Sequence, residues 1–249
     1  MIKQIILITD GCSNAGLNPI VAAAQAASAG VTVNVIGIVD QGEIGRSGVA
    51  EAEAIAQAGN GMCRIVELKD LAQTVRMMTQ KTVAETIRSV VEKELKKTFA
   101  VDSVEQLSPV KRAHVVKVMD DLSEQADIRV CLLIDTSASM RSKLSSIEDA
   151  IYDLSLSLEA RAGKSEISVL HYPDASGESA AVAMSWTDRP ADIRRLFGHL
   201  VMRGVTPTGP AIMGALSYML DGRIDRSRSA AEQERLREQE TGMLQDYVV

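Results

Sequence analysis

Residues 128–139 read IRVCLLIDTSAS, a mostly apolar run followed by a short polar loop. An apolar run of this length is typical of a strand that is covered on both faces, as in a parallel sheet. The loop brings one carboxylate and two hydroxyls, from Asp135, Ser137 and Ser139, to the start of a helix. Such oxygen ligands suit Mg²⁺ or Mn²⁺. Asp and Ser are also ordinary helix caps, so this stretch alone does not establish a metal site.

The next residues predict a long amphipathic helix, and strands alternate with helices along most of the chain. The apolar side chains of that helix recur every three or four residues, at Met140, Leu144, Ile147, Ile151, Leu154 and Leu158. Strands are expected at 3–9, 31–39, 62–66, 128–135, 166–172 and 180–186, and further helices at 19–29, 49–58, 190–202 and after Gly209. This alternation predicts an α/β fold with a doubly wound, mostly parallel sheet. The short polar link at 173–179 predicts a hairpin, and therefore one antiparallel edge strand.

Two other stretches carry polar residues at similar places. Residues 5–11 read IILITDG, an apolar strand that ends at Asp10, and residues 204–209 read GVTPTG, with Thr206 just before a helix. Taken singly, each polar residue has an ordinary structural role: Thr206 or Ser137 as a helix cap, and Asp10 as a turn residue. The conjunction of three such motifs, each at a strand end or a helix start, favours one shared metal site.

These motifs resemble those of the von Willebrand factor type A (VWA) family and its metal-ion-dependent adhesion site (MIDAS). The family motifs are D-x-S-x-S, a Thr in a G-x-T-P-T-G-like loop, and the Asp of a strand-ending T-D-G. The resemblance implies a Mg²⁺ or Mn²⁺ site formed by Asp135, Ser137, Ser139, Thr206 and Asp10. In the family the hydroxyls usually bind the metal directly, one or both carboxylates can act through water, and a carboxylate of a protein partner completes the coordination.

The third family motif comes first in this chain. The elements after Asp135 match the family's first half and those after Asp10 match its second half, so the resemblance implies a circularly permuted, Rossmann-like VWA domain. The strands that end at these two aspartates are neighbours in the family. They form a topological switch point, where open α/β sheets bind their ligands. We expect one chain to close on itself, and a domain-swapped dimer is the alternative to this monomer.

This interpretation divides the chain into four segments: 1–82 and 127–222 as the two halves of the domain, 83–126 as a helical hairpin that connects them, and 223–249 as a charged tail. The boundary at 82 is placed where the apolar face of a long helical stretch slips, near residues 79–82. The second helix of the hairpin begins at Pro109 and should have Val115, Val118 and Leu122 on its inner side.

Composition excludes several classes of protein. The 249 residues carry a net charge of −6, whereas a nucleic-acid-binding domain is normally basic. No apolar run approaches the length of a membrane span, and the chain starts directly with a strand, without the layout of a signal peptide. We therefore expect a cytoplasmic protein that binds neither nucleic acid nor membrane. The cysteines, Cys12, Cys63 and Cys131, are odd in number and widely spaced, which suits reduced thiols.

The expected function is binding and not catalysis: an adaptor module that captures an acidic side chain of a partner protein through the metal. The chain looks like small cytosolic VWA proteins of spore-forming bacteria. Similar bacterial modules often serve ATPase or kinase systems, so a partner of that kind is a hypothesis. The alternative is a Mg²⁺-dependent phosphatase or hydrolase that uses the same loops. However, residues 135–137 lack the second Asp of a D-x-D phosphatase loop, and the sequence places no Lys partner for it. A vestigial metal site is a third possibility.

Overall fold

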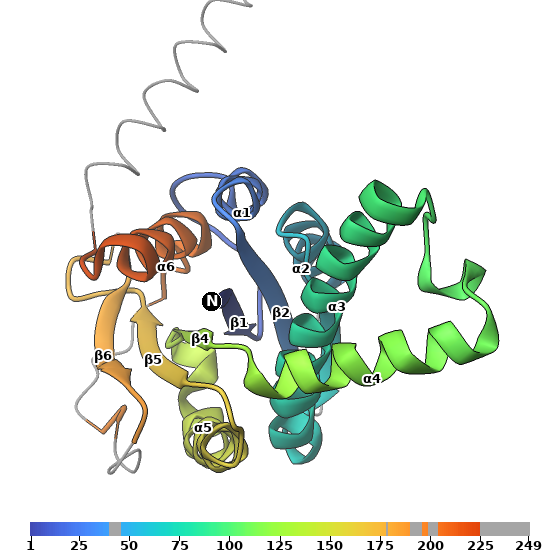
Figure 1. Cartoon of the computed structure of the whole chain (residues 1–249). Helices are drawn as coiled ribbons and strands as arrows, with labels where there is room; N and C mark the ends of the chain where they lie inside the picture. The colour runs from blue at the N-terminus through green and yellow to red at the C-terminus, as the bar shows by residue number, and fades with distance from the viewer. Residues whose placement is uncertain (40–45, 178, 190–195, 199–203, 225–249) are drawn as a thin grey trace, which may run out of the picture.

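A computed structural model of the chain describes residues 1–39, 46–177, 179–189, 196–198 and 204–224 (Figure 1). Its strands are β1 (Ile2–Thr9), β2 (Val31–Val39), β3 (Cys63–Glu67), β4 (Ile128–Asp135), β5 (Ser165–Tyr172) and β6 (Ala181–Thr187). Its α-helices are α1 (Pro19–Ser28), α2 (Arg46–Ala58), α3 (Leu71–Phe99), α4 (Pro109–Gln125), α5 (Leu144–Glu159) and α6 (Thr208–Asp221). The predicted helix at 190–202 lies almost wholly outside the described residues, as does the predicted tail beyond residue 224.

The six strands form one sheet in the order β3-β2-β1-β4-β5-β6. All neighbours are parallel except the pair β5 and β6 at one edge, which is antiparallel. The α/β fold with a mostly parallel sheet and an antiparallel edge strand is therefore confirmed. Chain order reverses between β1 and β4, which pair in parallel from Ile2 opposite Ile128 to Ile8 opposite Ile134. The switch point lies where the resemblance to the VWA family implied it, between the strands that lead to Asp10 and Asp135.

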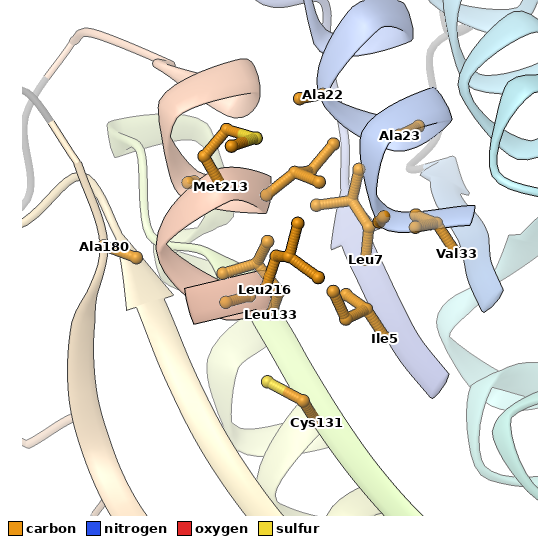
Figure 2. Close-up of a cluster of buried hydrophobic side chains, with 14 of the residues drawn as sticks. Ile5, Leu7, Ala22, Ala23, Val33, Cys131, Leu133, Ala180, Met213 and Leu216 are labelled. Carbon is orange, nitrogen blue, oxygen red and sulfur yellow. The ribbon is translucent and has the colours of Figure 1, made fainter. Parts of the chain in front are cut away.

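Helices cover both faces of this sheet, because the side chains of each strand point alternately to the two sides. Ile5 and Leu7 of β1 belong to a core with helices α1, α2 and α6, shown in Figure 2. Ile6 and Ile8 belong to a second core with helices α3 and α5. All four side chains are fully buried. Complete burial of an Ile or Leu side chain contributes about 1.5–3 kcal/mol, so the central strands stabilise both layers at once.

Helix α3 runs without a break from Leu71 to Phe99, so the segment boundary placed at 82 lies inside one continuous helix. The buried stripe continues through Thr74, Thr79 and Thr82, which the apolar pattern did not count. The hydroxyls of Thr79 and Thr82 can be buried because they have partners: that of Thr79 donates to the Val75 carbonyl at 2.9 Å. That of Thr82 accepts from the Asn34 side chain, also at 2.9 Å.

Helices α3 and α4 form the expected hairpin, which reaches to one side of the sheet in Figure 1. The predicted inner side of α4 is wrong. No residue of this helix is buried, and Val118 and Leu122 are 40% and 42% exposed. The three apolar positions were assigned from spacing alone, whereas α4 packs only lightly, against α3, and lies off the sheet. Among the described residues, no helix has both the length and the apolar character needed to cross a membrane.

We predict that the two glycines that bound residues 204–209 differ sharply in tolerance. A Cβ atom on Gly209, in the first turn of α6, would lie 1.9 Å from the backbone oxygen of Leu17. On Gly204 it would meet nothing within 4 Å. Gly209→Ala should lower the free energy of unfolding by about 1–3 kcal/mol, measured by thermal or urea denaturation. Gly204→Ala is the control and should change it by less than about 0.5 kcal/mol. Equal stability of the two variants would contradict the close contact.

Candidate metal centre

The carboxyl ends of β1 and β4 meet at a buried carboxylate. Asp135 is fully buried at the end of β4. Its Oδ2 accepts a hydrogen bond from the Thr9 hydroxyl at the end of β1, at 2.8 Å, and these residues are 126 positions apart. Its Oδ1 accepts from the backbone N–H of Ser137, also at 2.8 Å. Both carboxylate oxygens are thus fixed by donors, one from each half of the chain.

The two serines continue from this carboxylate towards Asp10. The hydroxyl oxygens of Ser137 and Ser139 lie 3.2 Å apart, and the Ser139 hydroxyl donates to Asp10 Oδ1 at 2.8 Å. Two adjacent ligands of an octahedral Mg²⁺, each about 2.1 Å from the ion, are roughly 3 Å apart. The serine hydroxyls therefore have the spacing of neighbouring ligands, and Ser139 is exposed to solvent. Hard, neutral oxygens beside two carboxylates fit Mg²⁺ or Mn²⁺, and these residues would hold the ion.

Lys143 is a further charged residue of the site, and sequence reasoning missed it. Its Nζ lies 2.7 Å from Asp10 Oδ2, and both side chains are almost completely buried. Lys143 ends the 3₁₀ turn Ala138–Lys143, which follows the Asp135 loop and leads into α5. That turn carries the lysine back over the carboxyl end of β1. The only signal in the sequence was a basic residue beside Leu144, at the start of the predicted apolar stripe.

Thr206 lies on the loop that leads into α6 and is attached to the loop after β1. Its backbone N–H donates to Asn14 Oδ1 at 2.7 Å, and its carbonyl accepts from the Asn14 backbone N–H at 3.2 Å. The Ser13 hydroxyl donates to the same carbonyl, at 3.2 Å. In the described part of the chain, no hydrogen bond joins Thr206 directly to Asp10, Asp135, Ser137 or Ser139. Four of the five predicted residues are thus brought together, and the fifth, Thr206, is joined through its backbone to Ser13 and Asn14 of the loop that follows Asp10.

Burial dominates the electrostatics of the site. It raises the pKa of the Asp135 carboxyl above its usual value, although hydrogen bonds from Ser137 and Thr9 favour the ionised form. Tyr172 at the end of β5 is also fully buried, and burial raises the pKa of its hydroxyl well above the usual range, helped by the negative charge of Asp135. Tyr172 is therefore a neutral neighbour. The charged side chains of the site are those of Asp10, Asp135 and Lys143. Among the described residues, no three or more His, Cys, Asp or Glu side chains form a group that could hold a metal ion.

We predict that the metal-free protein is stabilised by Asp135→Asn. The pKa of the Asp135 carboxyl is higher in the folded protein than in the unfolded chain. The contribution of this carboxyl to the free energy of unfolding is therefore most favourable below its unfolded-state pKa, and it is lost as the pH rises through its folded-state pKa. An amide removes that loss, since it can accept from the Ser137 N–H and donate to the Thr9 hydroxyl. In EDTA at pH 7 we expect a melting temperature about 2–4 °C higher, which corresponds to about 1 kcal/mol.

The difference should shrink as the pH falls towards about 4, where the carboxyl of the unfolded chain takes up its proton. Asp149→Asn, at an exposed position of α5, is the control and should leave the melting curve unchanged at each pH. A lower melting temperature for Asp135→Asn at every pH would show that the buried charge carries no net cost.

Comparison with known proteins gives two close relatives. No protein-family model matches the chain. The "Uncharacterized protein YabS" of Bacillus subtilis (strain 168) is 41% identical over 238 residues, which are 95% of this chain and 97% of that protein. The crystal structure of an uncharacterized protein from Alicyclobacillus acidocaldarius subsp. acidocaldarius DSM 446 matches with a TM-score of 0.83 and 42% identity, over 89% of this chain and 94% of that one.

A more distant match is to proximal thread matrix protein 1 of the mussel byssus, in a structure with a zinc-occupied MIDAS motif. Its TM-score is 0.27 at 18% identity, over 88% of this chain and 46% of that one. The two close matches cover nearly the whole of this chain and of each relative. The chain therefore belongs to the protein family that includes YabS of Bacillus subtilis.

Proposed function

We propose that this chain is a circularly permuted VWA domain and acts as a metal-dependent adaptor. Mg²⁺ or Mn²⁺ would be held by Asp10, Asp135, Ser137, Ser139 and Thr206. The observation that carries the proposal is the series of hydrogen bonds that runs across the switch point from Asp135, through the backbone N–H of Ser137 and the hydroxyls of Ser137 and Ser139, to Asp10. When bound, the metal supplies an electrophilic centre that accepts an acidic side chain of a partner protein.

The balance of ligands supports binding of an external carboxylate. Serine and threonine hydroxyls are neutral, so they leave more positive charge on the metal than a cage of carboxylates would. Ser139 is exposed, and the site therefore opens to solvent on its side. A partner's Asp or Glu can reach the metal there, without a cofactor pocket. We place the protein in the cytoplasm and propose a component of an ATPase or kinase system as its partner.

The enzymatic alternative has one observation in its favour, because Lys143 supplies a cation next to the acidic residues. The position of the carboxylates favours the adaptor. A phosphatase of the aspartate type needs a carboxylate oxygen free to attack phosphorus. Both oxygens of Asp135 accept hydrogen bonds, and its side chain is fully buried. Asp10 is held by Lys143 and Ser139. The described site thus presents the Ser139 hydroxyl to solvent, whereas Ser137 and the carboxylates of Asp10 and Asp135 are buried.

We predict that Mg²⁺ binding depends on the Ser139 hydroxyl. Isothermal titration of the metal-free protein with MgCl₂ should give a saturable heat and a rise in melting temperature. Ser139→Ala removes a proposed ligand without changing the charge and should weaken Mg²⁺ at least about tenfold. Ser142→Ala is a matched control in the same 3₁₀ turn, also exposed, and should bind as the wild type does. Absence of heat and of a thermal shift in the wild-type protein would indicate a vestigial site.

We further predict Mg²⁺-dependent capture of a protein from cell extract by the immobilised wild-type chain. Capture should be lost in EDTA and in Asp135→Ala, since both remove the metal. A generic phosphoester assay run on the same samples separates the two functions. Metal-dependent phosphoester turnover that disappears in Asp135→Ala would overturn the adaptor and establish the enzyme.

A further inference from the structure

The Lys143–Asp10 ion pair is the most deeply buried ion pair of the described residues. Its side chains are 7% and 6% exposed, whereas the next most buried pair, between Arg129 and Glu166, has 29% and 14%. A surface ion pair contributes little, because water and salt screen it. A buried pair interacts strongly, and a metal or ligand that enters next to it is subject to the same weakly screened charges.

A carboxylate in a metal site does not need a lysine partner once the metal is bound. Asp10 uses Oδ1 to accept from Ser139, a proposed metal ligand, and Oδ2 to bind Lys143. The ammonium group is therefore separated from the ligand hydroxyl by a single carboxylate. The metal and the lysine would both be attracted by the negative charge of Asp10. Each would therefore change the electrostatic energy of the other without any rearrangement of the site.

The formal charges show what this lysine changes. With Asp10, Asp135 and Lys143 ionised, the metal-free site has one net negative charge, and a divalent metal leaves one net positive charge. A carboxylate from a partner then makes the site neutral. Without the lysine, the metal-free site would have two net negative charges, the metal-loaded site would be neutral, and the loaded site with a partner's carboxylate would have one net negative charge. The lysine therefore opposes the metal and favours an anion on the metal-loaded site.

We propose that Lys143 couples metal binding to capture of an anionic ligand, by weakening the metal alone and strengthening the acidic ligand on the loaded site. This inference rests on the proposed function, because it concerns the same metal. Lys143 is a positioning and specificity-determining residue and not a metal ligand. It makes a carboxylate a better sixth ligand than a neutral amide or hydroxyl, which would leave the positive charge uncompensated.

The test compares Lys143→Met with Lys164→Met. Methionine removes the charge and keeps an unbranched chain. Lys164 directly precedes β5, at the end of the sheet opposite to Asp135, and its exposed ammonium group pairs with Glu166 at 2.8 Å, so its substitution makes the same change in net charge away from the site. Mg²⁺ affinity is measured by calorimetry. The anion is represented by acetate, titrated into the Mn²⁺-loaded protein and followed by water-proton relaxation as it displaces bound water.

Lys143→Met should bind Mg²⁺ at least about tenfold more tightly than the wild type, and acetate at least about tenfold more weakly, as expected for a unit charge a few ångströms away. Lys164→Met should match the wild type in both titrations. Opposite changes in the two affinities are the signature of the coupling, since a purely structural loss would weaken both.

Loss of Lys143 leaves Asp10 buried without its partner, so the single variant is also measured by thermal unfolding with and without Mg²⁺. Unchanged affinities, or changes in the same direction, in Lys143→Met would overturn the coupling while Mg²⁺ binding by the wild type keeps the adaptor. No Mg²⁺ binding by either protein would overturn both.

Discussion

The parallel pairing of β1 with β4, closed by the hydrogen bond from Thr9 to Asp135, is the constraint on which the rest of the structure depends. It joins the two halves of the chain at the centre of the sheet, and all the other strands are added outwards from it. Both strands are buried on both faces, so this pairing also unites the two cores. If it were lost, each half would retain three strands and an exposed apolar edge.

The chain needs a long connection because of this topology. It leaves the sheet at the outer strand β3 and must return to the centre to form β4. The first part of α3 serves as a covering helix, with Leu71, Val75 and Met78 in the core against the sheet. Its second part and α4 extend from the domain and carry the chain back, and their contacts with the sheet are few. The first part of α3 therefore belongs to the core, and its second part and α4 form the connection. The boundary placed at residue 82 thus lies inside one continuous helix.

The candidate site combines groups that are costly to bury with groups that offset the cost. Asp135 accepts two hydrogen bonds, and Asp10 accepts one and is paired with Lys143. Burial still raises the pKa of Asp135, which means that its charge is held at a cost in the absence of metal. A divalent cation would remove that cost. The relatives in the YabS family share more than 40% of their residues with this chain over nearly its whole length, so we expect the same sheet in them.

The sequence pattern by itself determined the fold class, whereas the pairing of β1 with β4 and the meeting of Asp10 with the Asp135 loop were predicted from the resemblance to the VWA family. Apolar runs and polar strand ends are local signals that survive in any sheet built from them. Tertiary structure alone decided that Thr79 and Thr82 are buried, that Val118 and Leu122 are exposed, and that Lys143 binds Asp10. Thr82 and Lys143 bind partners far away in the chain, Asn34 and Asp10. Spacing along one helix cannot show whether such a partner is present, because burial depends on which elements pack against that helix.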